Sequence, residues 1–166
     1  RLYITARGLS EAWINGRRAT EDRFVPGWTD YNKRLDVLTY DVTPLLRPGD
    51  NVLGVILGEG WYSGYLLWYG AKNHYGDTPS LLAELVVETD DGRAETIATD
   101  GQWKATTGPL LASDLYQGES YDARREMPGW SESGFQDSSW SAADLLPPPV
   151  GALLSARQAP AVRPIE

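Results

Sequence analysis

The chain has 166 residues, enough for one domain that buries roughly 70% of the surface of its unfolded chain. Hydrophobic residues make up 42% and charged residues 23% of the sequence, which excludes a largely disordered chain. A net charge of −8 repels phosphate backbones and anionic membranes, so we expect neither nucleic acid nor a membrane as a partner.

The sequence contains no apolar run long enough to span a bilayer and no basic-then-apolar signal segment at its start. It begins at Arg1 without methionine, which leads us to expect a fragment of a longer protein. It also contains no cysteine, which excludes a disulfide framework and a thiolate metal site. The compartment therefore stays open between the cytoplasm and secretion.

Alternation of apolar and polar residues with a period of two recurs along the chain, and helical periodicity is scarce. Residues 1–8 predict a first strand. The dipeptide Asn15-Gly16 predicts a two-residue hairpin turn, because both positions tolerate positive φ. Further strands are predicted in residues 34–43 and 51–57, separated by a turn-rich connection.

Residues 80–99 give the clearest pattern, an antiparallel hairpin with one apolar face, which is made by Leu81, Ala83, Leu85 and Val87. Two more short strands or extended loops are expected in residues 102–109 and 113–123. About eight short strands with frequent turns indicate an all-β fold, an antiparallel β-sandwich of the jelly-roll, galactose-binding-like type. We assign this sandwich to residues 1–146, and residues 147–166 to a Pro-rich linker or the start of another domain.

Residues 58–70, GEGWYSGYLLWYG, concentrate aromatic side chains among glycines; they are Trp61, Tyr62, Tyr65, Trp68 and Tyr69. Sandwich cores bury such rings readily, so core packing is one interpretation. Glycine weakens strand interiors, so an aromatic contact surface is the other. We expect some of these rings to pack in the core and others to bind a ligand.

The sequence offers no convincing catalytic group. His74 is the single histidine, and no serine lies in the context of a nucleophile elbow. The candidate acids for a glycosidase are Glu59, Glu119 and Asp122. Two of them would form a catalytic pair if their carboxyl groups lay about 5 to 10 Å apart. We favour the alternative that Asp122 and Arg124 form a salt bridge, while Glu119 satisfies a turn or a partner domain.

Three oxygen-rich loop segments have side chains that suit calcium, which takes six to eight oxygen ligands. None has the spacing of an EF-hand loop, and each also has the composition of a β-turn. The candidate pairs are Asp30 with Asn32, Asp50 with Asn51, and Asn73 with Asp77.

Taken in order, the segments PGWTDYNKRLDVLTYDVT, LRPGDNVLGVILGEGWYSG, YGDTPSLLAELVVETDDG, TDGQWKATTGP and YQGESYDARREMPGW resemble the N-terminal accessory domain of bacterial α-L-rhamnosidases. The resemblance extends from about Arg1 to Leu146, and GEGWYSG and GESYDAR are its most specific parts. It implies a jelly-roll module that precedes an (α/α)6-barrel, with the catalytic acids in that barrel. No catalytic residue is therefore expected here. Some related modules bind L-rhamnose through calcium, and by that analogy Asp50 and Asn51 become candidates for calcium and sugar contact.

The sequence thus leads us to expect a non-catalytic, carbohydrate-binding or substrate-positioning domain of a glycoside hydrolase that removes terminal α-L-rhamnosides. Calcium is the one cofactor considered. The candidate sugar contacts are Asp50, Asn51, Trp61, Tyr62, Tyr65, Asn73 and Asp77. The alternative is a structural domain that packs against the catalytic barrel of the same polypeptide. The candidate contacts for that role are Glu119, Asp122 and Arg124.

Overall fold

The computed structural model describes residues 1–66, 70–147 and 151–165. Short strands dominate these ranges. In chain order the elements are β1 (Leu2–Arg7), β2 (Leu9–Ile14), β3 (Arg17–Arg18), β4 (Arg34–Tyr40), a 3-10 turn (Thr43–Leu45), β5 (Leu53–Gly58), α1 (Gly60–Ser63), β6 (Ser80–Glu88), β7 (Ala94–Ala98), β8 (Lys104–Ala105), β9 (Leu110–Asp114), β10 (Gly118–Tyr121), a second 3-10 turn (Ala123–Arg125), β11 (Ser141–Ala142) and β12 (Leu153–Ala156). No helix in the described ranges is long and apolar enough to cross a membrane.

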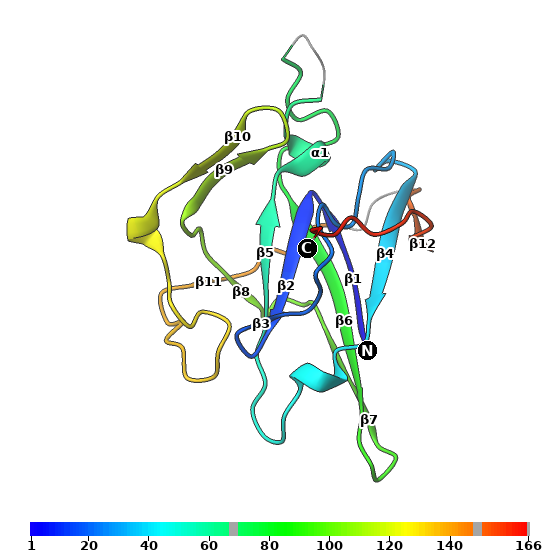
Figure 1. Cartoon of the computed structure of the whole chain (residues 1–166), viewed down its shortest axis with the longest axis vertical. Coiled ribbons are helices and arrows are strands. Elements are labelled where there is room, and N and C mark those ends of the chain that lie inside the picture. Colours follow the sequence, from blue (N-terminus) through cyan, green and yellow to red (C-terminus); the bar gives the residue numbers. More distant parts are fainter. Residues whose placement is uncertain (67–69, 148–150, 166) are drawn as a thin grey trace.

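Two sheets face each other and form the sandwich seen in Figure 1. The larger sheet has the strand order β12-β4-β1-β6-β7, and the smaller one has the order β3-β2-β5. Neighbouring strands run antiparallel except for β12, which pairs with β4 in parallel. The prediction of an all-β sandwich of jelly-roll type is therefore confirmed.

The core lies between the two sheets and is built from alternate residues of β1, β2, β4 and β6. Because side chains point to opposite faces with a period of two, β1, β2 and β6 each contribute two buried residues to this layer and β4 contributes one; two valines from loops complete it. Each fully buried aliphatic side chain stabilises the fold by about 1.5 to 3 kcal/mol. The buried cluster comprises Leu2, Ile4, Ala12, Ile14, Val25, Leu38, Val42, Ala83 and Leu85.

Two predicted hairpins are confirmed. Asn15 and Gly16 have φ angles of 51° and 79° and connect β2 to β3, as the Asn-Gly dipeptide indicated. Strands β6 and β7 pair in the second hairpin. Its predicted apolar face points into the core, where Ala83 and Leu85 are buried and Leu81 and Val87 pack against the cluster.

The C-terminal segment, for which we expected a linker or the start of another domain, contributes to the larger sheet. Residues 153–156 form β12, and the backbone N–H of Arg23 donates to the carbonyl of Val162 at 2.8 Å. Arg163 forms an ion pair of 2.7 Å with the carboxylate of Asp22. Residues 148–150 lie outside the described part of the chain.

Residues 104–142 form an outer arm that carries two small sheets, β8 with β11 and β9 with β10. Figure 1 shows this arm on the β5 side of the sandwich. Gly54 makes room for the indole of Trp130, and Gly58 faces the hydroxyl of Ser113. The two glycines of β5 therefore allow the arm to lie directly on the smaller sheet.

Candidate functional site

The predicted contact residues lie at opposite ends of β5. Asp50 and Asn51 precede this strand, whereas Trp61 and Tyr62 belong to α1, which follows it. A strand of six residues spans about 20 Å. Figure 1 shows the 43–52 connection and α1 at the two ends of the sandwich. The seven candidate residues therefore do not form one site.

The side chain of Asn51 is occupied within its own turn. Its Oδ1 accepts hydrogen bonds from Asn15 Nδ2 at 2.8 Å and from the Arg47 N–H at 3.0 Å. Its Nδ2 donates to the carbonyls of Arg47 and Gly49. Asn15 Oδ1 in turn accepts from the Val52 N–H. This amide therefore holds the turn that leads into β5.

The carboxylate of Asp50 is exposed and has no hydrogen bond or ion pair with any other described residue. Its backbone carbonyl accepts from Arg47 Nε at 3.2 Å. The groups of this turn that could act as calcium ligands are the Asp50 carboxylate and backbone carbonyls. The described residues contain no group of three or more His, Cys, Asp or Glu side chains that could hold a metal ion. Most of the six to eight ligands that calcium takes would therefore have to come from carbonyls, water or a bound hydroxyl compound.

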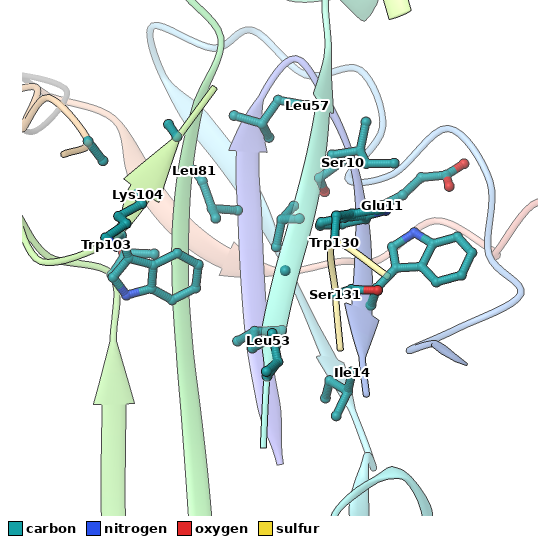
Figure 2. Close-up of a pocket in the computed structure, with 18 of the residues that line it drawn as sticks. Ser10, Glu11, Ile14, Leu53, Leu57, Leu81, Trp103, Lys104, Trp130 and Ser131 are labelled. Atoms are coloured by element: carbon teal, nitrogen blue, oxygen red, sulfur yellow. The ribbon is translucent and has the colours of Figure 1, made fainter. Parts of the chain in front are cut away.

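A broad, open hollow of about 2530 Å³ is lined by residues of both sheets and of the arm. All of β5 takes part in its lining, as do Asp50 and Asn51, and we call it the β5 groove. Figure 2 shows Trp103 and Lys104 on one side of β5, and Trp130 and Glu11 on the other. Strand β5 is the edge strand of the smaller sheet. In the described sheets it pairs with β2 on one side only, and the groove follows this edge strand.

Several side chains in this groove are fixed by contacts with the arm and the sheet. Trp103 Nε1 donates to the carbonyl of Ala98 at 3.1 Å, and Lys104 forms an ion pair of 2.7 Å with Asp137. The indole of Trp130 meets that of Trp13 edge to face, with ring centroids 6.3 Å apart. The groove therefore presents oriented indole rings beside polar groups.

At the other end of β5, Tyr62 lies in a second, smaller core. Its ring meets Tyr31 edge to face at 5.3 Å, and Tyr31 lies 5.0 Å from Tyr75. Desolvation by burial raises the pKa of Tyr31 well above its ordinary value. Tyr62 is therefore buried in this smaller core.

Trp61 belongs to a partly exposed aromatic group. Its indole is nearly parallel to that of Trp28, with an interplanar angle of 7° and ring centroids 6.4 Å apart. Phe24 lies 6.3 Å from Trp61, and Trp28 and Phe24 are 54% and 49% exposed. Trp28 and Phe24 were not among the predicted contact residues. Their place in FVPGWTD, a turn-forming segment, was the signal that could have revealed them.

The backbone of Tyr65 is tied to the arm, and the residue is partly buried. Its N–H donates to Asp114 Oδ2 at 2.6 Å, and Lys72 Nζ lies 5.9 Å from the ring centroid. Asn73 and Asp77 are exposed in the loop that follows. The predicted aromatic residues Trp68 and Tyr69 lie outside the described residues.

The three carboxylates considered for catalysis occupy different settings. Glu59 forms an ion pair of 2.6 Å with Lys72. Glu119 is exposed on β10. Asp122 accepts two hydrogen bonds of 2.8 Å from the guanidinium of Arg124, which lowers the pKa of this carboxyl. The predicted Asp122–Arg124 salt bridge is confirmed.

The opposed sheets and their short connections define a jelly-roll β-sandwich domain. The profile of the family described as "Alpha-L-rhamnosidase N-terminal domain" matches residues 1–166, and the chain belongs to this family. An alpha-L-rhamnosidase of Streptomyces avermitilis is 49% identical over 142 residues, which are 86% of this chain and 14% of that protein. One of Formosa agariphila is 45% identical over 150 residues, which are 89% and 16% of the two chains.

Solved structures show the same fold. The alpha-L-rhamnosidase of Streptomyces avermitilis complexed with L-rhamnose matches 99% of this chain and 16% of that chain, with a TM-score of 0.95 and 44% identity. The enzyme from Aspergillus terreus matches 98% and 19% of the two chains, with a TM-score of 0.91 and 46% identity. The chain thus spans less than a fifth of the length of these relatives and matches one part of each of these alpha-L-rhamnosidases.

Proposed function

We propose that this chain is a carbohydrate-binding, substrate-positioning domain of an α-L-rhamnosidase and that it holds rhamnosyl groups in the groove along β5. Membership of the rhamnosidase family supports the choice of sugar. The observation that carries the proposal is the position of Asp50 on the lining of a groove that also contains Trp103 and Trp130. Its carboxylate has no partner among the described residues. Sugar sites combine an aromatic face for the apolar side of the ring with polar groups for its hydroxyls.

Calcium belongs to this proposal as a cofactor held at Asp50. The carboxylate of Asp50 and nearby backbone carbonyls would hold the cation, which would supply positive charge for the oxygens of a bound sugar. A monosaccharide offers few atoms, and its hydroxyls lose water when it binds. We therefore expect a dissociation constant of about 0.1 to 1 mM.

The test is a calorimetric titration of the chain with L-rhamnose, once with calcium and once with a chelator, with D-galactose as the control sugar. We expect heat for rhamnose in the presence of calcium, and its loss in Asp50→Ala and Trp103→Ala. Trp28→Ala is the matched control at the other end of β5. If only Trp28→Ala abolishes binding, the site lies in the aromatic group instead. Absence of heat under every condition contradicts carbohydrate binding.

A second candidate function is packing against the rest of the rhamnosidase. The large accessible surface of the chain favours it. The chain exposes 10977 Å², whereas a folded monomer of 18.3 kDa exposes about 8,100 Å². Part of the excess lies on the β9–β10 hairpin, where Leu111, Tyr116 and Tyr121 are at least half exposed. Two-stranded hairpins are marginally stable alone. Packing would give this hairpin a supporting surface.

This second candidate is tested by comparing the chain with a full-length rhamnosidase that contains it. Packing predicts that the amides of β9 and β10 exchange with solvent more slowly in the full-length enzyme. Tyr116→Ser and Tyr121→Ser should then lower the melting temperature of the full-length enzyme more than that of the chain. Equal exchange and equal shifts would exclude packing through this hairpin.

A further inference from the structure

The turn between β2 and β3 is bonded to the loop of residues 45–52, which leads into β5. Asn15 of this turn donates from Nδ2 to Asn51 Oδ1 at 2.8 Å and to the carbonyl of Leu45 at 2.9 Å. Its Oδ1 accepts from the N–H of Val52 at 3.0 Å, and its own N–H donates to the carbonyl of the same residue at 3.1 Å. The hydrogen bonds of one residue therefore reach both ends of the loop.

The same turn is bonded to the outer arm. The N–H of Gly16 donates to the carbonyl of Ser131 at 3.0 Å. The side chain of Glu132 lies against this glycine, because a Cβ there would be 2.9 Å from Glu132 Oε1. Figure 2 shows Ser131 and Trp130 on the side of β5 where Ile14, the residue before the turn, also lies. The turn therefore joins the 45–52 loop to the part of the arm that carries Trp130.

The position of Asp50 depends on Asn51, and that of Asn51 depends on Asn15. The Asp50 carboxylate is exposed and makes no hydrogen bond or ion pair with another described residue, so its place follows from the backbone on either side. Asn51 Nδ2 closes this backbone into a turn by donating to the carbonyls of Arg47 and Gly49. Asn15 Nδ2 donates to the opposite end of the same amide. Partners at both ends hold an amide in one orientation.

We propose that Asn15 is a positioning residue of the β5 groove, which holds the Asp50 carboxylate in one place relative to Trp130. This inference rests on the proposed function, in which Asp50 holds calcium for a bound sugar. Asn15 is not part of the groove lining, so it acts through Asn51 and not by contact with the ligand. A ligand binds only the molecules whose site is already arranged, and its apparent dissociation constant rises as their fraction falls.

Asn15→Gly tests this role, because glycine adopts the φ of 51° without strain and removes only the amide. We expect the dissociation constant for L-rhamnose, measured by calorimetry with calcium present, to rise about tenfold. The matched control is Ile4→Val, which removes one methylene from the core, lowers the melting temperature and leaves the groove lining intact. Its dissociation constant should not change. Equal weakening in both variants would overturn the proposal, since a general loss of stability would then be the cause.

An excess of calcium gives a readout that a merely structural role would not move. If Asn15→Gly lowers only the fraction of molecules in which Asp50 is in place, excess calcium should restore that fraction. The dissociation constant for rhamnose should then return to within about twofold of its value in the unchanged chain. In Asp50→Ala the same excess should restore nothing, because the carboxylate that holds the cation is missing. A loss in Asn15→Gly that calcium does not reverse would contradict the positioning role.

The unchanged chain separates this inference from the proposed function. If it binds rhamnose with calcium and Asn15→Gly binds equally well, the positioning role fails and the proposed function stands. If the unchanged chain gives no heat with or without calcium, both fail. Weaker binding in Asn15→Gly, normal binding in Ile4→Val and recovery with calcium together support the positioning role.

Discussion

Glu59 and Ser113 exchange two hydrogen bonds across 54 positions of the sequence. The Glu59 N–H donates to Ser113 Oγ at 3.0 Å, and the Ser113 N–H donates to Glu59 Oε2 at 3.1 Å. The second carboxylate oxygen binds Lys72. This pair fixes the arm to the end of β5, so the acidic residue in GEGWYSG has a structural role.

Removal of the Ser113 hydroxyl should loosen this connection. Ser113→Ala leaves the Glu59 N–H without its acceptor, and we expect the free energy of unfolding to fall by about 1 kcal/mol. Urea denaturation followed by circular dichroism measures the change. Ser120→Ala on the exposed strand β10 is the control. Equal stability of the two variants would contradict a structural role for the pair.

Asp114 should make part of the stability dependent on acidic pH. Desolvation alone would raise the pKa of this carboxyl, but the N–H groups of Tyr65, Gln117 and Tyr116 outweigh it and lower the pKa below its ordinary value of 3.8. Because the pKa of Asp114 is lowered in the folded state, its charged carboxylate adds to the free energy of unfolding. This contribution is complete above pH 3.8 and is lost as the pH falls through the folded-state pKa. We expect Asp114→Asn to be less stable than the unchanged chain at pH 7.

The difference between Asp114→Asn and the unchanged chain should shrink below pH 3.8, since protonation removes the same charge. Urea denaturation at a series of pH values measures it. Asp90→Asn, in the turn between β6 and β7, is the control. A difference that stays constant from neutral to strongly acidic pH would contradict the assignment.

Gly54 should tolerate no side chain. A Cβ at this position would collide with Trp130, and overpacking of this kind costs about 1 to 3 kcal/mol. We expect Gly54→Ala to lower stability and to change the tryptophan fluorescence. Gly101→Ala is the control, because its Cβ would lie 3.6 Å from its nearest neighbour, Leu145. Unchanged fluorescence in Gly54→Ala would mean that Trp130 does not pack on β5.

Asp50 and Asn51 should respond differently to substitution, although they are adjacent. Asn51→Ala removes the hydrogen bonds that hold residues 47–51, and we expect a loss of about 1 to 3 kcal/mol. Asp50→Ala should change stability by less than about 0.5 kcal/mol, because the carboxylate has no partner in the part of the chain that the structure describes. Thermal denaturation of both variants measures this. A large loss in Asp50→Ala would remove the basis for using it as a specific test of sugar binding.

The strands and their hairpins were predictable because they depend on local signals. The period of two in residues 80–87 and the turn dipeptide Asn15-Gly16 each specify their element without distant contacts. The aromatic group of Trp28 and Trp61 was not predictable in this way, because it joins a loop to α1 across 33 positions of the sequence. The parallel pairing of β12 with β4 likewise depends on a contact across more than a hundred residues.

The distance between Asp50 and Trp61 was also not predictable from local sequence signals. Residues 50–61 are close in sequence, but an extended strand between them places their ends far apart. The sequence pattern indicated both the strand and its flanking loops. The pattern does not give the orientation of the strand relative to the rest of the fold. This orientation decides which loops lie at the same end of the sandwich.

Strand β12 also protects its neighbour. It covers the outer edge of β4, whose other edge is paired with β1. A polypeptide cut before Leu153 would leave a row of unpaired N–H and C=O groups along β4, and such an edge pairs readily with another copy of itself. Aggregation of the shortened protein is therefore the expected consequence, which would make residues 153–156 a guard against self-association as well as a part of the sheet.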